Sequence, residues 1–270
     1  MNTCKFPDAG AWIHCLSDPD ASRLDLYCFA HAGGAADSFF GWPHRISGPV
    51  SIFAAQLPGR RERFHEPLAQ DIGTVAAILA EQIATRRHQA AVFFGHSLGG
   101  LIAFEVALRL EGKRPPVEII AAGCGAPTRK RHAEPMHLLP SRKFRERLRA
   151  MGGTPPEVLE DDELMALFEP VLRADLRLAE TYRIDRRART SAFLSAWGGV
   201  EDSLVHTEML AAWSECTQSR CEIRLFPGGH FFPQTQSGAL LDAVNSRLTW
   251  WLEEHQDAGG CVSLSNAAPA

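Results

Sequence analysis

A short segment near the middle of the chain, Gly95-His96-Ser97-Leu98-Gly99, limits the possible folds more than any other. It follows an apolar run at residues 90–94 and precedes a helical pattern that begins at residue 101. At such a corner the serine stands clear of the sheet, and glycines two residues to either side let the strand and the helix cross without a clash. The N-terminus of the helix offers free N–H groups and a partial positive charge. The segment therefore predicts a strained turn that presents Ser97 as a nucleophile.

Strand-like and helix-like segments alternate along most of the chain. We expect strands at residues 24–30, 50–56, 90–94, 117–122, 191–197 and 221–226. We expect helices at residues 72–85, 101–110 and 240–252, where apolar residues recur three and four positions apart. Apolar strands that alternate with helices indicate an α/β fold, in which a mostly parallel sheet has helices on both faces.

One long segment interrupts this alternation. Between residues 127 and 189 we find no convincing strand, and two groups of apolar residues follow helical spacing. The groups are Phe144, Leu148 and Met151, and then Leu164, Leu167, Phe168, Val171 and Leu172, with a kink or a restart expected at Pro170. We therefore divide the chain into a core at residues 1–126 and 190–256, a helical insertion at residues 127–189, and a tail at residues 257–270 that we expect to be disordered.

Composition and charge argue against several other classes of protein. With a net charge of −4, the 270-residue chain gives no overall reason to bind nucleic acid. No stretch approaches the ~18–20 continuous apolar residues of a membrane span, and residues 1–10 lack the apolar core of a signal peptide. The seven cysteines are scattered, and nothing near the closest pair, Cys216 and Cys221, completes a metal site. We therefore expect a cytoplasmic protein with reduced thiols and no bound metal.

A serine nucleophile needs a histidine as its base and an acid that orients the histidine. On this type of fold the chain order is serine, acid, histidine. Of the eleven histidines, His230 fits this order best, because it follows the last predicted strand in a glycine-containing loop. Glu201 and Asp202 follow the strand before it, and either carboxylate could face the ring. We choose Asp202, because a shorter side chain holds a more fixed geometry.

The same chemistry needs two N–H donors for the oxyanion that develops during the reaction. One is the backbone N–H of Leu98, the residue directly after the serine. The other is expected in the loop after an early strand, where the sequence FAHAGG offers the N–H of Ala32. Gly33 and Gly34 allow a close approach of the backbone at this loop.

Seven segments spread over nearly the whole chain carry a more specific resemblance. They are FAHAGG, LPGRRERFHEP, FFGHSLGG, GGTPPEVLEDDEL, LRADLRLAETY, GGVEDSLV and FPGGHFF. Together they resemble the type II thioesterases, the stand-alone editing hydrolases of polyketide and nonribosomal peptide synthesis. The resemblance implies an α/β-hydrolase fold, Ser97, Asp202 and His230 as catalytic residues, and Ala32 and Leu98 as oxyanion donors. The segments between residues 152 and 182 are the most diagnostic, because generic α/β-hydrolases do not share them.

The resemblance also implies a substrate and a partner. In this family the acyl group arrives on the phosphopantetheine arm of an acyl or peptidyl carrier protein. Ser97 would take the acyl group and water would release it, so the enzyme needs no cofactor of its own. The helical insertion would form a lid over the acyl channel, and a monomer is expected.

Carrier proteins are typically acidic, so a basic surface would suit them. Residues 129–149 carry many arginines and lysines but only two glutamates, Glu134 and Glu146. If Phe144, Leu148 and Met151 are buried, the outward residues form the candidate docking site. These residues are Arg142, Lys143, Arg145 and Arg149.

Three other functions stay open from the sequence alone. The same serine, histidine and acid would serve a carboxylesterase that acts on small free esters. They would also serve an acyltransferase that hands the acyl group to an alcohol or an amine. In the third alternative, the hydrolase fold is catalytically idle and binds a partner.

Overall fold

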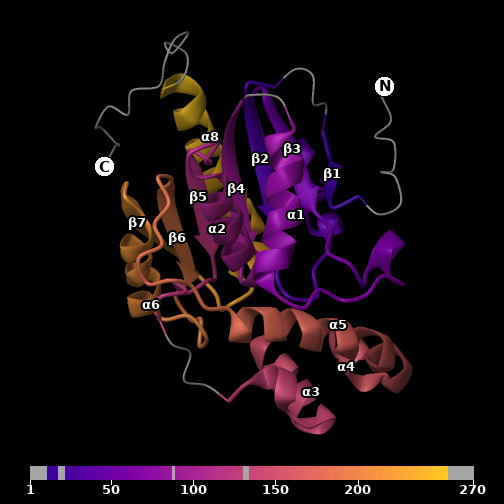
Figure 1. The fold of residues 1–270 in the computed structure, drawn as a ribbon. Coiled ribbons are helices and arrows are strands. Elements are labelled where there is room, and N and C mark those ends of the chain that lie inside the picture. The colour runs from indigo at the N-terminus through magenta and orange to yellow at the C-terminus, as the bar shows by residue number, and fades with distance from the viewer. Residues whose placement is uncertain (1–10, 18–21, 87–88, 130–133, 255–270) are drawn as a thin grey trace.

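Seven strands form one mostly parallel sheet (Figure 1). They are β1 (Ile13–Cys15), β2 (Leu24–Phe29), β3 (Val50–Ala55), β4 (Ala90–His96), β5 (Glu118–Ala122), β6 (Phe193–Gly199) and β7 (Cys221–Phe226). The order across the sheet is β1-β3-β2-β4-β5-β6-β7, with β1 antiparallel to β3 and all other neighbours parallel. This computed structural model describes residues 11–17, 22–86, 89–129 and 134–254. The tail predicted at residues 257–270 lies outside these ranges.

Helices cover both faces of the sheet (Figure 1). On one face, α1 (Ile72–Ala84) and α2 (Leu98–Leu110) pack against strand residues such as Tyr27 and Phe93. On the other face, α8 (Ser237–Glu254) packs against Leu26 and Phe94. The short helices α6 (Thr207–Ala211) and α7 (Phe232–Thr235) join the first and the second face, respectively. Because successive apolar side chains of β2 and β4 enter opposite clusters, these strands are buried on both sides, which explains why their sequences are almost entirely apolar.

The six predicted strands and the three predicted helices of the core are confirmed, with ends that shift by a few residues. Strand β1 was not predicted from the sequence; it is a three-residue strand at the edge of the sheet, where it pairs with β3. A strand this short carries too few residues for a periodic pattern to show. Helix α2 begins at Leu98, directly after the serine, so the first turn of the helix contains the second half of the glycine segment.

The described residues between β5 and β6 contain helices and no strand. They are α3 (Ser141–Met151), α4 (Pro156–Glu160) and α5 (Asp162–Thr181), preceded by a short 3-10 turn at Met136–Leu138. Figure 1 shows these helices as a separate layer beyond one end of the sheet. Their apolar side chains form a third cluster, which includes Phe144, Leu148, Met165 and Leu172. Residues 127–189 therefore hold a helical layer with a small core of its own, and we keep these limits as proposed bounds of the insertion.

The predicted buried face of α5 was wrong in its first half. Leu167 and Phe168, which were expected to be buried, are 51% and 46% exposed, and the helix continues through Pro170 without a restart. Val171 and Leu172 are buried as predicted, and Met165 and Asp175 are buried with them. A carboxylate does not count in an apolar pattern, so Asp175 could not be placed on this face from the sequence.

Within the described ranges, no helix combines the length and the apolar character that a membrane-crossing segment needs.

Candidate active site

Ser97 lies at the sharp corner between β4 and α2, in a backbone conformation that few residues other than glycine adopt. Its φ is 53° and its ψ is −113°. A Cβ atom at Gly95 would lie 2.3 Å from the carbonyl oxygen of Gly99, in the first turn of α2. A Cβ atom at Gly99 would lie 2.0 Å from the carbonyl oxygen of Phe29, at the end of β2. Both glycines are therefore sterically required, the first by the helix and the second by the neighbouring strand.

The structure brings Ser97, His230 and Asp202 together in one hydrogen-bonded line. The Nε2 atom of His230 lies 3.0 Å from the Ser97 hydroxyl oxygen, and its Nδ1 atom lies 2.9 Å from Oδ2 of Asp202. A carboxylate only accepts hydrogen bonds, so Nδ1 carries the ring proton and Nε2 is left to accept from the serine hydroxyl. The geometry therefore suits proton transfer from Ser97 to His230.

Asp202 is oriented by the backbone that follows it. Its Oδ1 atom accepts hydrogen bonds from the N–H groups of Leu204, at 2.8 Å, and Val205, at 3.1 Å. This leaves Oδ2 for His230, and the whole residue is only 5% exposed. Glu201, the alternative considered from the sequence, is exposed to solvent. The carboxylate that faces the ring is the one chosen from the sequence.

The two predicted oxyanion donors lie at adjacent ends of neighbouring strands. Leu98 is the first residue of α2, so its N–H is among those that the helix cannot satisfy internally. Ala32 lies in the loop after β2, the strand paired in parallel with β4. The rings of His31 and His96, which precede Ala32 and Ser97, are 5.1 Å apart. Both N–H groups therefore belong to backbone next to the serine.

His96 supports the site in a way that the sequence analysis missed. Its Nε2 atom lies 2.9 Å from the backbone carbonyl oxygen of His230. A carbonyl oxygen only accepts, so His96 Nε2 carries a proton and its buried Nδ1 atom has no partner among the described residues. Burial, together with the neighbouring His31 and His230, holds the pKa of His96 well below its usual range. The signal was its place beside Ser97, but chain order had directed the search only to histidines after the serine.

His31 is also neutral at pH 7. Burial lowers the pKa of His31 to about 4, and the nearby His230 and Arg60 contribute in the same direction. Its ring packs edge-on against Phe231, with 5.2 Å between the ring centroids. These contacts make His31 part of the packed structure of the loop.

The four candidate docking residues on α3 differ in their surroundings. Arg142 is 89% exposed and pairs with Glu146, and Lys143 is exposed. Arg149 lies 3.9 Å from Glu160. Arg145, however, was expected to point outward, and it is only 25% exposed, because it donates to Asp162 of α5 at 2.6 Å. The expectation was wrong for Arg145, since the sequence pattern did not show that α5 packs beside this residue.

In the part of the chain that the structure describes, no group of three or more histidine, cysteine, aspartate or glutamate side chains could hold a metal ion.

The sheet order, the serine corner and the chain order of Ser97, Asp202 and His230 define an α/β-hydrolase fold with a candidate serine nucleophile. Residues 25–248 match the thioesterase domain family, so the chain belongs to the thioesterase family.

Named relatives and solved structures agree with this family. The chain is 35% identical over 241 residues to the probable cadicidin biosynthesis thioesterase of Streptomyces griseus. This match covers 89% of this chain and 65% of that protein. It is 35% identical over 239 residues to the gramicidin S biosynthesis protein GrsT of Aneurinibacillus migulanus, with 88% of this chain and 93% of that protein covered. The type II thioesterase BorB from the borrelidin biosynthetic cluster superposes with a TM-score of 0.79 and 32% identity, over 88% of this chain and 97% of that chain.

Proposed function

We propose that this protein is a type II thioesterase that removes acyl groups from the phosphopantetheine arm of acyl or peptidyl carrier proteins. The observation that carries the chemistry is the line from Ser97 through His230 to Asp202, with hydrogen-bond distances of 3.0 Å and 2.9 Å. The family and the named relatives support thioesters of polyketide or nonribosomal peptide synthesis as the substrate class.

Ser97 attacks the thioester carbonyl carbon while its hydroxyl proton moves to Nε2 of His230. The tetrahedral oxyanion is stabilised by the N–H groups of Ala32 and Leu98. When this intermediate collapses, the carbon–sulfur bond breaks, and the pantetheine sulfur takes the proton from His230. A water molecule then attacks the acyl-enzyme with His230 as its base, which releases the carboxylic acid and restores Ser97.

Asp202 holds the proton of His230 on Nδ1 and stabilises the positive ring that forms during each half of the reaction. Its own orientation is fixed by the N–H groups of Leu204 and Val205. His96 positions the backbone of His230 through the hydrogen bond to its carbonyl oxygen. No cofactor takes part in any of these steps.

The helical layer at residues 127–189 is the lid of this enzyme. Its contact with the site is close, since a Cβ atom at Gly153 would lie 2.2 Å from the ring of Phe231, the residue after His230. A carrier protein docks on α3, where Arg142 and Lys143 are exposed. The enzyme acts in the cytoplasm as a monomer.

The decisive experiment uses the full chain and a panel of acyl-loaded carrier proteins. Mass spectrometry of the carrier reports the loss of the acyl group, and parallel assays use oxygen esters with the same acyl groups. We expect the acyl-loaded carriers to be deacylated faster than the oxygen esters. The Ser97→Ala variant should retain at most a small residual rate. Preference for free oxygen esters would favour a carboxylesterase, and acyl transfer to an added alcohol or amine would favour an acyltransferase. Either result would contradict this proposal.

A further inference from the structure

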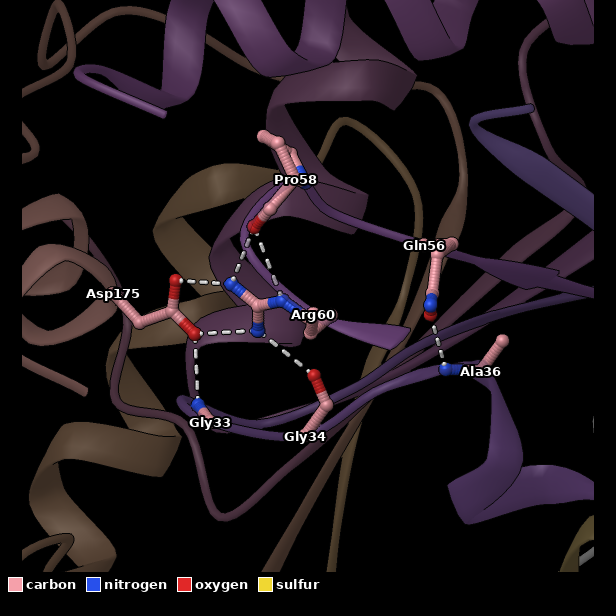
Figure 2. A network of polar contacts seen from close by, with 7 residues as sticks. All are labelled: Gly33, Gly34, Ala36, Gln56, Pro58, Arg60 and Asp175. Atoms are coloured by element: carbon pink, nitrogen blue, oxygen red, sulfur yellow. Dashed lines mark hydrogen bonds and ion pairs between the residues drawn. The ribbon is translucent and has the colours of Figure 1, made fainter. Parts of the chain in front are cut away.

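Two of the sequence segments noted above have no part in the Ser97–His230–Asp202 line, yet they meet beside it. LPGRRERFHEP contributes Arg60, between β3 and α1, and LRADLRLAETY contributes Asp175, from α5. Their side chains form a two-pronged ion pair, with Nη1 2.7 Å from Oδ2 and Nη2 2.8 Å from Oδ1 (Figure 2). Both residues are buried, at 7% and 1% exposure.

All five N–H groups of Arg60 are used. Two point to Asp175, one to the carbonyl oxygen of Gly34 at 2.8 Å, and two to the carbonyl oxygen of Pro58 at 3.2 Å and 3.3 Å. A buried ion pair is a weak source of stability, because the desolvation of both charges offsets most of their attraction. An apolar pair would hold these segments together as well. The value of the pair therefore lies in the polar groups that it positions.

Those polar groups belong to the loop that carries the oxyanion donor Ala32. Oδ2 of Asp175 accepts the N–H of Gly33 at 2.7 Å, and Arg60 donates to the carbonyl oxygen of Gly34 (Figure 2). The N–H of Gly34 also donates to the carbonyl oxygen of His31 at 2.9 Å. With a φ of +80° at Gly33, these features are those of a type II turn with Ala32 and Gly33 at its centre.

A turn of this type differs from a type I turn mainly by a flip of its central peptide. Here the central peptide joins Ala32 to Gly33, and its N–H is the group that Asp175 accepts. The carboxylate therefore selects one of the two orientations, which sets ψ of Ala32, and it ties the peptide that directly follows the Ala32 N–H to α5. Gly33 also lies directly against α5, because a Cβ atom at this position would lie 2.5 Å from Cδ2 of Leu172. The loop thus rests on α5 at both Leu172 and Asp175.

The segment around Arg60 braces the rest of the same loop. Gln56 accepts the N–H of Ala36 at 2.8 Å (Figure 2), and Arg61 forms an ion pair with Asp37. Arg61 has a φ of 51°, and among the described residues other than glycine only Ser97 shares a positive φ. Such strain persists only where the surrounding contacts determine the backbone.

We propose that Arg60 and Asp175 are positioning residues that hold the Ala32 N–H in the oxyanion hole, so that the geometry of the hole depends on the seating of α5. This inference rests on the proposed function, because it assigns the ion pair to the serine reaction. Neither side chain touches the reacting atoms; each acts through the backbone of the loop.

The test compares Asp175→Asn and Arg60→Lys with a matched control on the same helix, Glu169→Gln. Glu169 pairs with Arg173 of the same helix at 2.7 Å and accepts a hydrogen bond from Ser141 of α3 at 2.8 Å, so its loss disturbs α5 without touching Gly33. The amide in Asp175→Asn can still accept from Gly33 but can no longer pair with Arg60 at both oxygens. Lysine in Arg60→Lys keeps the charge and loses the planar fork that reaches Asp175 and Gly34 together.

Three measurements separate positioning from folding. Titration with a fluorophosphonate counts the active sites; kcat and KM are measured per active site with an acyl thioester of N-acetylcysteamine. The third measurement is the inhibition constant of a trifluoromethyl ketone for each variant. Ser97 adds to the carbonyl carbon of this inhibitor, and the resulting oxyanion occupies the oxyanion hole. We expect Asp175→Asn to lower kcat about 10–100-fold, by the misplacement of one donor, with little change in KM. The inhibition constant should rise in parallel with the loss in kcat/KM, and Arg60→Lys should show a smaller loss of the same kind.

The Glu169→Gln control should keep the wild-type kcat and inhibition constant. If the ion pair is merely structural, its loss would lower the number of titratable active sites and leave kcat and the inhibition constant of each remaining site unchanged. That result would overturn the inference. If Asp175→Asn fails to fold, Arg60→Lys decides: a wild-type kcat and inhibition constant for this variant also overturns it. Failure of the wild type to react with the fluorophosphonate at Ser97 would instead contradict the proposed function.

Discussion

Ser97 and its neighbours show how far single backbone conformations determine this site. The serine has a φ of 53°, and such strain is retained only where the surroundings require it. Gly95 and Gly99 allow the turn, because neither position has room for a Cβ atom. Asp202 divides its two oxygens between the backbone and His230. The position of Ser97 is thus set by its backbone, and the orientation of Asp202 by backbone N–H groups two and three residues further along the chain.

The role of Asp202 predicts a specific defect in Asp202→Asn. The amide oxygen can still accept from Leu204 and Val205, which leaves the NH2 group facing Nδ1 of His230. The ring must then carry its proton on Nε2, where it cannot accept the proton of Ser97. We expect kcat to fall about 10³–10⁴-fold, and steady-state hydrolysis of a short acyl thioester measures it. Glu201→Gln is the control, because Glu201 is exposed, and it should keep nearly full activity. The reverse ranking of the two variants would mean that the acid is misassigned.

The low pKa of His31 predicts how stability changes with pH. The pKa is about 4 in the folded protein and about 6.5 in the unfolded chain, so between these values the unfolded state binds more protons. The stability that neutral His31 contributes is therefore complete above pH 6.5 and is lost as the pH falls toward 4. Near pH 5 the His31→Gln variant should take up about one proton fewer on unfolding than the wild type. The slope of its unfolding free energy against pH should therefore be smaller by about 1.4 kcal/mol per pH unit. Denaturant titrations at several pH values measure both slopes, and equal slopes would show that His31 is protonated in the fold.

Among the secondary-structure elements, those with regular apolar patterns could be predicted and those with irregular ones could not. The central strands β2 and β4 are buried on both faces, so their sequences are almost entirely apolar. Helix α5 was found, but only part of its buried face was, because Asp175 lies on that face among apolar residues. The ion pair of Asp175 with Arg60 joins residues 115 positions apart, which no local pattern can show. Ser97 and His230 were accessible from the sequence because the fold gives their chain order and their place after a strand.

The contact between α3 and α5 predicts different effects for two neighbouring basic residues. Arg145 donates to Asp162 of α5 at 2.6 Å, whereas Lys143 is exposed on α3. Arg145→Glu would place two carboxylates together, and we expect a loss of about 1 kcal/mol in the unfolding free energy, since the pair is partly exposed. Lys143→Glu should change it by less than about 0.5 kcal/mol. Denaturant unfolding measures both, and hydrogen exchange of the α3 amides should accelerate only in Arg145→Glu. Equal effects would show that the pair with Asp162 does not hold the two helices together.

In the whole molecule, the helices inserted between β5 and β6 lie close to the serine site. Helices cover both faces of the sheet, and the helical layer of α3, α4 and α5 lies beyond one end of it (Figure 1). This layer meets the site at two places, Gly153 against Phe231 and Asp175 against Gly33. Under the proposed function, a substrate on a long flexible arm would approach beside this layer, and we expect the surface that receives its carrier on or near α3, α4 and α5.

The exposed charge on α3 predicts how the reaction with carrier proteins depends on salt. The chain has a net charge of −4, so attraction to an acidic carrier must come from a local surface, and Arg142 and Lys143 provide one. Screening shortens the reach of such charges from about 30 Å at 0.01 M salt to about 8 Å at 0.15 M. We therefore expect kcat/KM for an acyl carrier protein to fall over this range, while kcat/KM for the free acyl thioester stays nearly constant.

A matched pair of charge reversals locates this effect. Lys143→Glu should lower kcat/KM for the carrier, flatten its salt dependence and leave the free thioester unaffected. Lys113→Glu makes the same change in net charge just after the C-terminus of α2, whose N-terminus holds the serine corner, so it should leave both substrates unaffected. Equal losses in the two variants would mean that the carrier senses only the total charge of the enzyme. Steering by a local patch requires the patch itself to carry the charge. If Lys143→Glu keeps the wild-type kcat/KM for the carrier and the wild-type salt dependence, Lys143 is therefore not part of the docking surface.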